Sequence, residues 1–321
     1  MAYFDLHIAD FRCEEDSDDL FERIVAAAQA AEGAGFDSLS VMDHFHQLPS
    51  FMARSDPILE GYVLLGALAA RTSRIRLGTL VTGVTYRNPA LLAKMVTTLD
   101  VVSGGRAYLG IGASWNEDEY RAYGYGEALL PIRERLDRLE EALEVCRAMF
   151  TGAEAHFRGR RYRLEGALNY PRPVQPGGPP ILVGGGGERR LLRLVARYAD
   201  ISNVFGDPAT VRHKLDVLER HCEEIERDPA EIVKTHTGML IIATSASEAE
   251  RRAAAARQAT GMDEATFRAR CIWGDPDGVA EQAQPLLDAG LDGLMWFTRA
   301  LWTPEDVALA GKAIEKLGGR R

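Results

Sequence analysis

The sequence predicts an α/β fold, a (β/α)8 TIM barrel, in a chain of 321 residues. Short apolar runs rich in β-branched residues alternate with stretches of helical periodicity, which is typical of βα units around a parallel sheet. Eight such runs can be counted, and eight strands close a barrel of this kind. The count favours closure over a doubly wound open sheet, which is also built from βα units. The predicted strands are Tyr3 to Ala9, Asp37 to Met42, Ile75 to Thr82, Ala107 to Ile111, Ile181 to Val183, Ile201 to Val204, His236 to Ala243 and Gly293 to Phe297.

Helix starts are marked by a capping side chain followed directly by proline. An Asp, Asn or Thr side chain can accept a hydrogen bond from a free N–H of the first turn, and proline fits the first helical position because no donor is needed there. Helices are therefore expected after most strands. The capping pairs are Asp56-Pro57, Asn88-Pro89, Asp207-Pro208, Asp228-Pro229, Asp275-Pro276 and Thr303-Pro304.

The βα spacing is irregular at two places. Residues 113–180 are too many for one loop and one helix, so we expect an insertion after the fourth strand. It should hold an amphipathic helix from Ile132 to Phe150 and a hairpin from His156 to Arg163. A second surplus, from Gly261 to Gly274, precedes the last βα unit. We expect residues 1–321 to form one barrel domain, with the insertions as lids or interfaces.

The charge balance excludes several classes of partner. Hydrophobic residues make up 46% of the chain and charged residues 26%, which is ordinary for a globular protein with a substantial core. The net charge is -9, whereas proteins that bind nucleic acids or acidic membranes need basic patches. We therefore expect no nucleic acid and no membrane among its partners.

Cysteine usage and the first residues indicate a cytoplasmic protein. Cys13, Cys146, Cys222 and Cys271 have no paired spacing, so neither a disulfide framework nor a zinc site is predicted. The chain starts with a strand-like run instead of a basic leader, and it contains no stretch of ~18 apolar residues. Neither an export signal nor a membrane span is expected.

Polar side chains follow the second predicted strand, at the end of the barrel where this fold carries its active sites. The strand runs into Asp43 and His44. An imidazole titrates near neutral pH and can exchange a proton with a reacting oxygen, while an adjacent acid can orient a cofactor. The alternative is a capped loop whose polar side chains are solvated. We regard His44 as the candidate catalytic residue.

The other histidines receive different interpretations. His44 and His46 are spaced as metal ligands can be, but the remaining strand ends offer glycines, Asn203 and a Thr-Arg pair instead of further ligands. No metal site is therefore predicted. His7 and His236 lie within predicted strands, and a structural role is expected for both.

Small residues follow the third and fourth strands. Gly83 interrupts a β-branched run, where it either ends the strand or lets the backbone approach a planar ligand. Gly112, Ala113 and Ser114 leave room above the barrel, and the Ser114 hydroxyl can bind a ligand. Trp115 follows them and is the tryptophan that we expect in the pocket wall.

Four glycines, Gly184 to Gly187, follow the fifth strand and are expected to lead directly into a helix. Amide groups at a helix N-terminus bind phosphate, and glycines permit a close approach. The sequence thus predicts an anion site at this loop, although many barrels hold phosphate after the seventh and eighth strands instead.

These motifs, in this order, resemble the luciferase-like monooxygenase superfamily, in the branch that uses the deazaflavin coenzyme F-420 (F420). The resemblance spans essentially the whole chain, and it is more specific for the superfamily than for the cofactor. The segments that carry it are Ser40 to Phe45, Leu77 to Thr79, Asn88-Pro89, Ser103 to Arg106, Gly110 to Gly112, Gly184 to Gly187, and Ala199-Asp200.

The resemblance implies roles for the candidate residues. Asp43 and the Gly83-Val84 backbone would contact the deazaflavin ring, and the non-prolyl cis peptide of the family would fall at Gly83-Val84. His44 would give or take the substrate proton during hydride transfer. The residues that would border the ring are Gly112, Ala113 and Ser114, and those that would hold the phosphate are Gly185, Gly186 and Gly187.

By this resemblance the chain is an oxidoreductase that transfers a hydride between F420 and a small-molecule substrate, and it can form a homodimer. The alternative is a monooxygenase that uses reduced flavin mononucleotide (FMN) and O2. Less favoured readings are a noncatalytic flavin-binding barrel and a metal hydrolase. Leu48 stands near the position where the sugar-phosphate dehydrogenases of this branch carry a tryptophan, which argues against a sugar phosphate as substrate.

Overall fold

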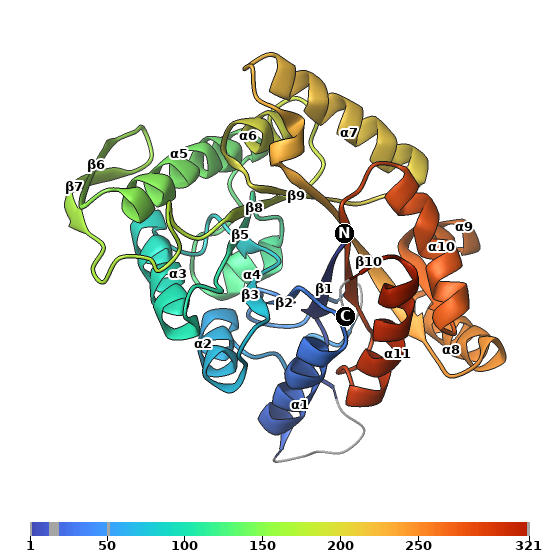
Figure 1. Ribbon diagram of the computed structural model, residues 1–321. Helices are drawn as coiled ribbons and strands as arrows, with labels where there is room; N and C mark the ends of the chain where they lie inside the picture. Colours follow the sequence, from blue (N-terminus) through green and yellow to red (C-terminus); the bar gives the residue numbers. More distant parts are fainter. Residues whose placement is uncertain (1, 13–18, 50–51, 320–321) are drawn as a thin grey trace.

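A parallel barrel with helices around it forms the centre of the molecule, as the sequence predicts (Figure 1). The computed structural model describes residues 2–12, 19–49 and 52–319. Its strands are β1 (Tyr3–Ile8), β2 (Ser38–Val41), β3 (Arg76–Thr79), β4 (Thr82–Gly83), β5 (Leu109–Gly112), β6 (Glu154–Arg158), β7 (Arg163–Leu168), β8 (Ile181–Gly184), β9 (Ile201–Val204), β10 (Val233–Ile242), β11 (Cys271–Gly274) and β12 (Gly293–Phe297).

The order of the strands shows how the barrel closes. The sheet runs β3-β2-β1-β12-β10-β9-β8-β5-β4, and β11 adds to β10. The third predicted strand consists of two pieces, because β3 pairs with β2 and β4 pairs with β5. A bridge between Leu77 and Ala107 joins β3 to the start of β5 as well. The first and last members of the series, β3 and β4, are therefore consecutive pieces of one strand, and this closes the barrel.

The helices surround the strands in Figure 1, as expected where parallel strands alternate with crossover helices. They are α1 (Leu20–Gly33), α2 (Gly61–Arg71), α3 (Pro89–Ser103), α4 (Glu117–Ala122), α5 (Ile132–Thr151), α6 (Leu191–Tyr198), α7 (Pro208–Glu223), η1 (Pro229–Glu231), α8 (Ala246–Thr260), α9 (Glu264–Arg270), α10 (Pro276–Asp288) and α11 (Pro304–Lys316).

Strand β1 separates the core outside the barrel from polar side chains inside it. Phe4, Leu6 and Ile8 are fully buried and belong to the large apolar core between strands and helices. Asp5 and His7 alternate with them, so they face the inside, where both hydrogen-bond to serines of β2. The structural role that we expected for His7 thus comes with a place in the interior of the barrel.

Most of the predicted capping pairs begin helices. The caps of α3, α7, α10 and α11 are Asn88, Asp207, Asp275 and Thr303, and each accepts a first-turn N–H. Asp228 begins the short 3-10 helix η1. The prediction at Asp56-Pro57 is wrong, because Asp56 accepts a hydrogen bond from the Ala53 N–H, three residues earlier, and so closes a turn. Helix α2 begins only at Gly61, capped by Glu60.

The two surplus segments take different forms. Residues 113–180 contain α4, the long helix α5 that packs on α3, and the antiparallel hairpin β6-β7, which lies outside α5 in Figure 1. The hairpin strands flank and extend the predicted segment. Residues 261–274 contain α9 and β11, and β11 extends the sheet by pairing with the end of β10.

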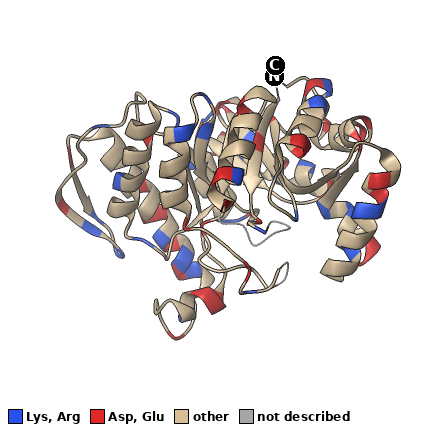
Figure 2. Cartoon of the chain, turned by 90° about the horizontal axis from the view of Figure 1, so that it is seen from below, with Lys and Arg blue, Asp and Glu red and all other residues tan. Residues whose placement is uncertain are grey.

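Acidic and basic positions are interspersed over the helices in Figure 2, with neither sign gathered in one region of that view. Cys146, Cys222 and Cys271 are buried free thiols, while Cys13 lies outside the described residues. Among the described helices, none is both long and apolar enough to cross a membrane.

Candidate active site

Two adjoining cavities lie at the carboxyl ends of the barrel strands. The first, of about 300 Å³, is lined mainly by strand ends and backbone, and the second, of about 240 Å³, mainly by apolar side chains. His44, Leu80, Trp115 and Phe205 line both, so they form the shared wall. The first cavity is completed by Val81, Thr82, Gly83, Tyr86, Gly112, Ala113, Ser114, Gly184, Gly185, Leu191 and Asn203, and the second by His7, Ala9, Met42, Leu48, Met52, Thr237, Phe297, Thr298 and Arg299.

His44 is bound to a buried carboxylate that the sequence reading did not identify. Its Nδ1 lies 2.7 Å from Glu119 Oε2, and the Glu119 side chain is fully buried. The same oxygen accepts the Tyr86 hydroxyl at 2.5 Å, while Oε1 accepts the Phe45 N–H. If the carboxylate is ionised, Nδ1 carries the proton that it donates to Glu119. The other ring nitrogen of His44 is then left with a lone pair.

Glu119 is held in its charged form. Burial alone would raise the pKa of Glu119, but hydrogen bonds from His44, Tyr86 and the Phe45 N–H together hold it below its ordinary value. The Tyr86 hydroxyl in turn has a raised pKa because of burial and its contact with Glu119, so it stays a donor. A buried carboxylate next to an imidazole stabilises the protonated ring, which suits His44 to exchange protons.

Glu119 reaches His44 because of a local capping pattern. Helix α4 begins after Asn116, whose side-chain oxygen accepts the Glu119 N–H at 3.3 Å. This places Glu119 in the first turn, where helix N-termini favour acidic side chains. The pattern Asn-x-x-Glu is visible in the sequence and could have identified the helix start. Its contact with His44, 75 residues away, could not be read from that pattern.

Asp43 does not line either cavity. Its side chain is fully buried and accepts two hydrogen bonds from Arg87, at 2.6 and 2.9 Å. Burial raises the pKa of Asp43 to about 6, while the pairing with Arg87 acts in the opposite direction. Arg87 also pairs with Glu60 at 2.6 Å. The contact of Asp43 with a cofactor ring stays a prediction.

The non-prolyl cis peptide lies at Leu80-Val81, so the position expected from the resemblance, Gly83-Val84, is wrong. The reason is the division of the third strand, because the chain leaves β3 at Thr79 and joins β5 only from Thr82. Leu80 and Val81 form this junction and line the first cavity, whereas Val84 is buried outside the lining.

Gly83 and Ser114 meet at the mouth of the first cavity. A Cβ added to Gly83 would lie 2.7 Å from Ser114 Oγ, so any residue larger than glycine would displace the Ser114 hydroxyl. Ser114 has a left-handed backbone, φ 59°, and its hydroxyl accepts a hydrogen bond from Thr85 Oγ1 at 2.9 Å. The Ser114 hydrogen remains able to bind a ligand. Together with Gly112 and Ala113, these predicted residues do line the cavity.

The glycine loop after β8 differs from the expected form. Gly185 lines the first cavity with a φ of 126°, but α6 begins only at Leu191, so the glycines do not lead directly into a helix. Gly186 and Gly187 lie outside the lining. A Cβ on Gly186 would come 3.5 Å from Lys214 Cε, and the Lys214 Nζ pairs with Glu188 at 2.5 Å. The sequence reading missed this cation because α7 supplies it from a later βα unit.

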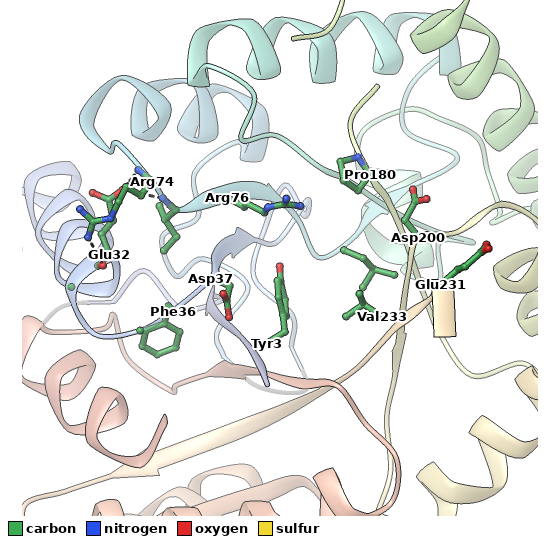
Figure 3. Close-up of a pocket in the computed structure, with 14 residues that line it drawn as sticks. Tyr3, Glu32, Phe36, Asp37, Arg74, Arg76, Pro180, Asp200, Glu231 and Val233 are labelled. Carbon is green, nitrogen blue, oxygen red and sulfur yellow. Dashed lines mark hydrogen bonds between the residues drawn. The ribbon is translucent and has the colours of Figure 1, made fainter. Parts of the chain in front are cut away.

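A larger hollow of about 650 Å³ lies at the amino ends of the strands (Figure 3). Side chains of both signs line it, among them Glu32, Arg74, Arg76 and Glu231. Glu32 accepts backbone N–H groups of the loop before β3, which is a structural task. Because barrels of this class work at the carboxyl end, the candidate site is the pair of cavities around His44. Among the described residues, no group of three His, Cys, Asp or Glu side chains could hold a metal ion.

The sequence model of the luciferase-like monooxygenase family matches residues 6–293. The chain belongs to this family. An F420-dependent glucose-6-phosphate dehydrogenase of Nocardia farcinica is 31% identical over 304 residues, covering 85% of this chain and 87% of that protein. Uncharacterised proteins of Mycobacterium tuberculosis and Mycobacterium bovis are 37% identical over 192 residues. This match covers 54% of this chain and 64% of each relative, which is less than two thirds of the relative's length.

Solved structures of other proteins share the fold. An F420-dependent secondary alcohol dehydrogenase in complex with an F420-acetone adduct superposes with a TM-score of 0.83 over 98% of this chain and 99% of that chain, at 19% identity. A monooxygenase from Streptomyces bottropensis superposes with a TM-score of 0.81 over 97% of both chains, at 20% identity. At these identities the similarity shows the fold alone.

Proposed function

We propose that this luciferase-like protein is an F420-dependent oxidoreductase, in which a hydride passes between the deazaflavin in the first cavity and a small organic substrate in the second. The observation that carries the proposal is the His44–Glu119 pair in the wall that both cavities share. The name and the extended match of the Nocardia farcinica relative favour F420 over other flavins.

The first cavity suits a flat, anionic cofactor. Backbone at Gly83, Gly112 and Gly184 lets a planar ring approach closely, and Leu80 and Val81 give it an apolar face. Ser114 can donate its hydroxyl hydrogen to a ring oxygen. The glycine loop, with Lys214 beside Gly186, would hold a phosphate. When bound, F420 accepts or gives a hydride at one carbon of its ring.

His44 would exchange the proton that accompanies hydride transfer. Its free ring nitrogen is an acceptor because Nδ1 binds Glu119, so it can take the proton of a substrate hydroxyl when the hydride leaves the adjacent carbon. The carboxylate of Glu119 then stabilises the imidazolium. In the reverse direction the same nitrogen returns the proton to the oxygen of a carbonyl group.

The second cavity indicates the kind of substrate. Met42, Leu48, Met52 and Phe297 make much of its wall apolar. Against these side chains, most of the hydroxyl groups of a sugar phosphate would lose water without gaining a partner. A small molecule with an apolar body and few polar groups fits better.

A spectroscopic titration of the purified chain with F420 and with FMN tests this proposal. We expect tighter binding of F420 than of FMN, and oxidation of small secondary alcohols with reduction of F420. The His44→Ala variant should keep the F420 affinity and lose turnover. Binding of FMN but not F420, together with O2 uptake by reduced FMN, would instead favour a monooxygenase. Turnover unaffected by His44→Ala would leave the His44 role without support.

A further inference from the structure

Two imidazoles line the second cavity, His7 from β1 and His44 from the loop after β2, the strand that pairs with β1. His7 is 5% exposed, and its Nδ1 lies 2.8 Å from the Ser40 hydroxyl inside the barrel. Among the described residues, none forms a hydrogen bond with His7 Nε2. This atom is not one of the fully buried polar atoms, so it has some exposed surface. Nε2 is therefore the ring atom that is accessible from the cavity.

Polar side chains inside the barrel fix which ring nitrogen of His7 carries the proton. Asp5 accepts the Ser38 hydroxyl at Oδ1 and the Ser40 hydroxyl at Oδ2. Ser38 is itself the acceptor of the Tyr3 hydroxyl, at 2.6 Å. Because Ser40 gives its only hydrogen to Asp5, it can take part in the contact with His7 only as an acceptor. Nδ1 of His7 is then the donor, and Nε2 has a lone pair.

The threonines of this cavity are also acceptors toward a ligand. Thr237 donates its hydroxyl hydrogen to Asn203 Oδ1 at 3.0 Å, and Thr298 donates to the Ala300 carbonyl at 2.6 Å. Only lone pairs remain for a ligand at these hydroxyl groups. The Nδ1–H groups of His44 and His7 are bound to Glu119 and Ser40, and among the described residues that line the cavity the other side-chain N–H groups are those of Trp115 and Arg299. The region around the two imidazoles is therefore rich in acceptors.

We propose that His7 Nε2 is a second hydrogen-bond acceptor for the substrate, and that it selects molecules with a hydroxyl group next to the one that His44 deprotonates. One O–H group has one hydrogen and cannot serve both imidazoles, so a substrate that satisfies both must carry two donors. A vicinal diol on an apolar body meets this demand. The proposal rests on the proposed function for the role of His44.

The two hydroxyl groups have different fates. At the first, the O–H proton passes to His44 and the C–H hydride to F420, so the carbon becomes a carbonyl and the deazaflavin is reduced. The second hydroxyl keeps its proton and only donates to His7. Burial lowers the pKa of His7 to about 3, which fits a ring that accepts a hydrogen bond without taking the proton. The product is an α-hydroxycarbonyl compound.

The tautomer of His7 can be measured directly by NMR on the full chain labelled with 15N-histidine, without any cofactor. The His7 signals are identified by their absence in His7→Gln. We expect Nδ1 to carry the proton and Nε2 to be unprotonated at pH 7.5. A His7 ring protonated at Nε2 would overturn the proposal. In Ser40→Ala, which removes the acceptor, we expect this preference for one tautomer to weaken.

Butane-2,3-diol and butan-2-ol are matched probes that differ by one hydroxyl group. We expect the diol, at its highest usable concentration, to shift the His7 Nε2 signal and the alcohol to leave it unchanged, with F420 present. We also expect kcat/KM to favour the diol about three- to tenfold. His7→Leu should bring this ratio to about one, since leucine keeps the bulk without the lone pair.

The outcomes separate this proposal from the proposed function. If the diol shifts His7 Nε2 but neither probe is oxidised, the proposed function is contradicted while the role of His7 is supported. If both probes are oxidised equally well and Nε2 does not shift, the selection by His7 is wrong and the oxidoreductase activity stands. A preference for the diol that survives His7→Leu would also overturn the proposed selection by His7.

Discussion

At the scale of single residues, the candidate site depends on a contact between Glu119 and His44. His44 could be predicted from the sequence, because it follows a strand that ends at the mouth of the barrel. Glu119 could not, because it reaches the site from a short helix in another βα unit. The contact fixes the ring orientation of His44 and gives a protonated imidazole its counter-charge. In the proposed reaction His44 would meet the reacting atoms, whereas Glu119 would position it.

Substitutions in this pair should lower turnover in a graded way. We expect His44→Gln to lower kcat by about 100- to 10,000-fold, the usual contribution of a general acid or base. Glu119→Gln should cost about tenfold or more, since an amide still accepts Nδ1–H but does not stabilise the imidazolium. In Glu119→Gln the acidic limb of the kcat/KM profile should also move to lower pH, a change that a merely structural role would not cause.

His46→Gln is the matched control. His46 lies two positions from His44 but outside both cavities, and its Nδ1 binds the Gln47 carbonyl at 3.0 Å. Its replacement should leave kcat within about twofold of the wild type. A drop equal to that of His44→Gln would mean that the wrong histidine carries the proton.

Asp43 and Arg87 form a second residue pair whose role is tested by stability. Arg87→Ala leaves the fully buried Asp43 carboxylate without its cation, and such a change costs about 3 to 5 kcal/mol in the free energy of unfolding. Urea denaturation at pH 7.5 measures this. Arg121→Ala removes an exposed ion pair with Asp118 and should cost less than about 1 kcal/mol. Equal losses would contradict the assignment of a buried pair.

At the scale of elements, strands and capped helices could largely be predicted from the sequence. Strand β9 (Ile201–Val204) and strand β12 (Gly293–Phe297) have the predicted bounds, because short apolar runs between polar loops have few alternatives. The division of the third strand could not be predicted, since it depends on a change of partner from β2 to β5. The start of α2 was mispredicted because Asp56 satisfies a local turn instead.

The junction between β3 and β5 gives a prediction about stability. A Cβ on Gly110 of β5 would lie 1.8 Å from the Thr79 carbonyl oxygen, which is backbone and cannot move without breaking the ladder. Gly110→Ala should therefore lower the free energy of unfolding by about 1 to 3 kcal/mol or more. Gly66→Ala is the control, because nothing lies within 4 Å of a Cβ there and alanine favours the helix. It should leave stability unchanged or raise it by up to about 1 kcal/mol.

At the scale of the whole molecule, two buried histidines make stability depend on pH. Burial lowers the pKa of His236 from 6.5 to about 4, and that of His7 to about 3. The unfolded chain therefore binds protons that the folded chain does not as pH falls below about 6.5, and folding is weakened there. Each such residue contributes a slope of up to about 1.4 kcal/mol per pH unit.

The test is urea denaturation of the wild type and His236→Asn at several values between pH 4.5 and 7.5. We expect the curve of unfolding free energy against pH to be flatter for His236→Asn. The exposed His156 on the β6-β7 hairpin is the control, and His156→Gln should follow the wild type. Parallel curves for all three proteins would show that His236 is protonated in the folded state as well.

The arrangement of the whole barrel also explains which parts of the site lay beyond the sequence. Residues 80 to 205 contribute the first cavity together with His44, and the second is completed by residues of β1, of the segment after β2, and of β10 and β12 with the loop after it. Strand ends could be predicted one at a time, but the adjacency of Lys214 to Gly186, or of His7 to His44, comes from the packing of neighbouring βα units. Long-range neighbours of this kind carry no local signal.

A crystal structure of the chain soaked with F420 would show whether the first cavity holds the cofactor. We expect the deazaflavin ring in the cavity bordered by Gly83, Gly112 and Gly184, with its reactive carbon facing the space between His44 and Leu48. A ring bound in the hollow at the amino ends of the strands, or a first cavity that stays closed to the cofactor, would contradict it.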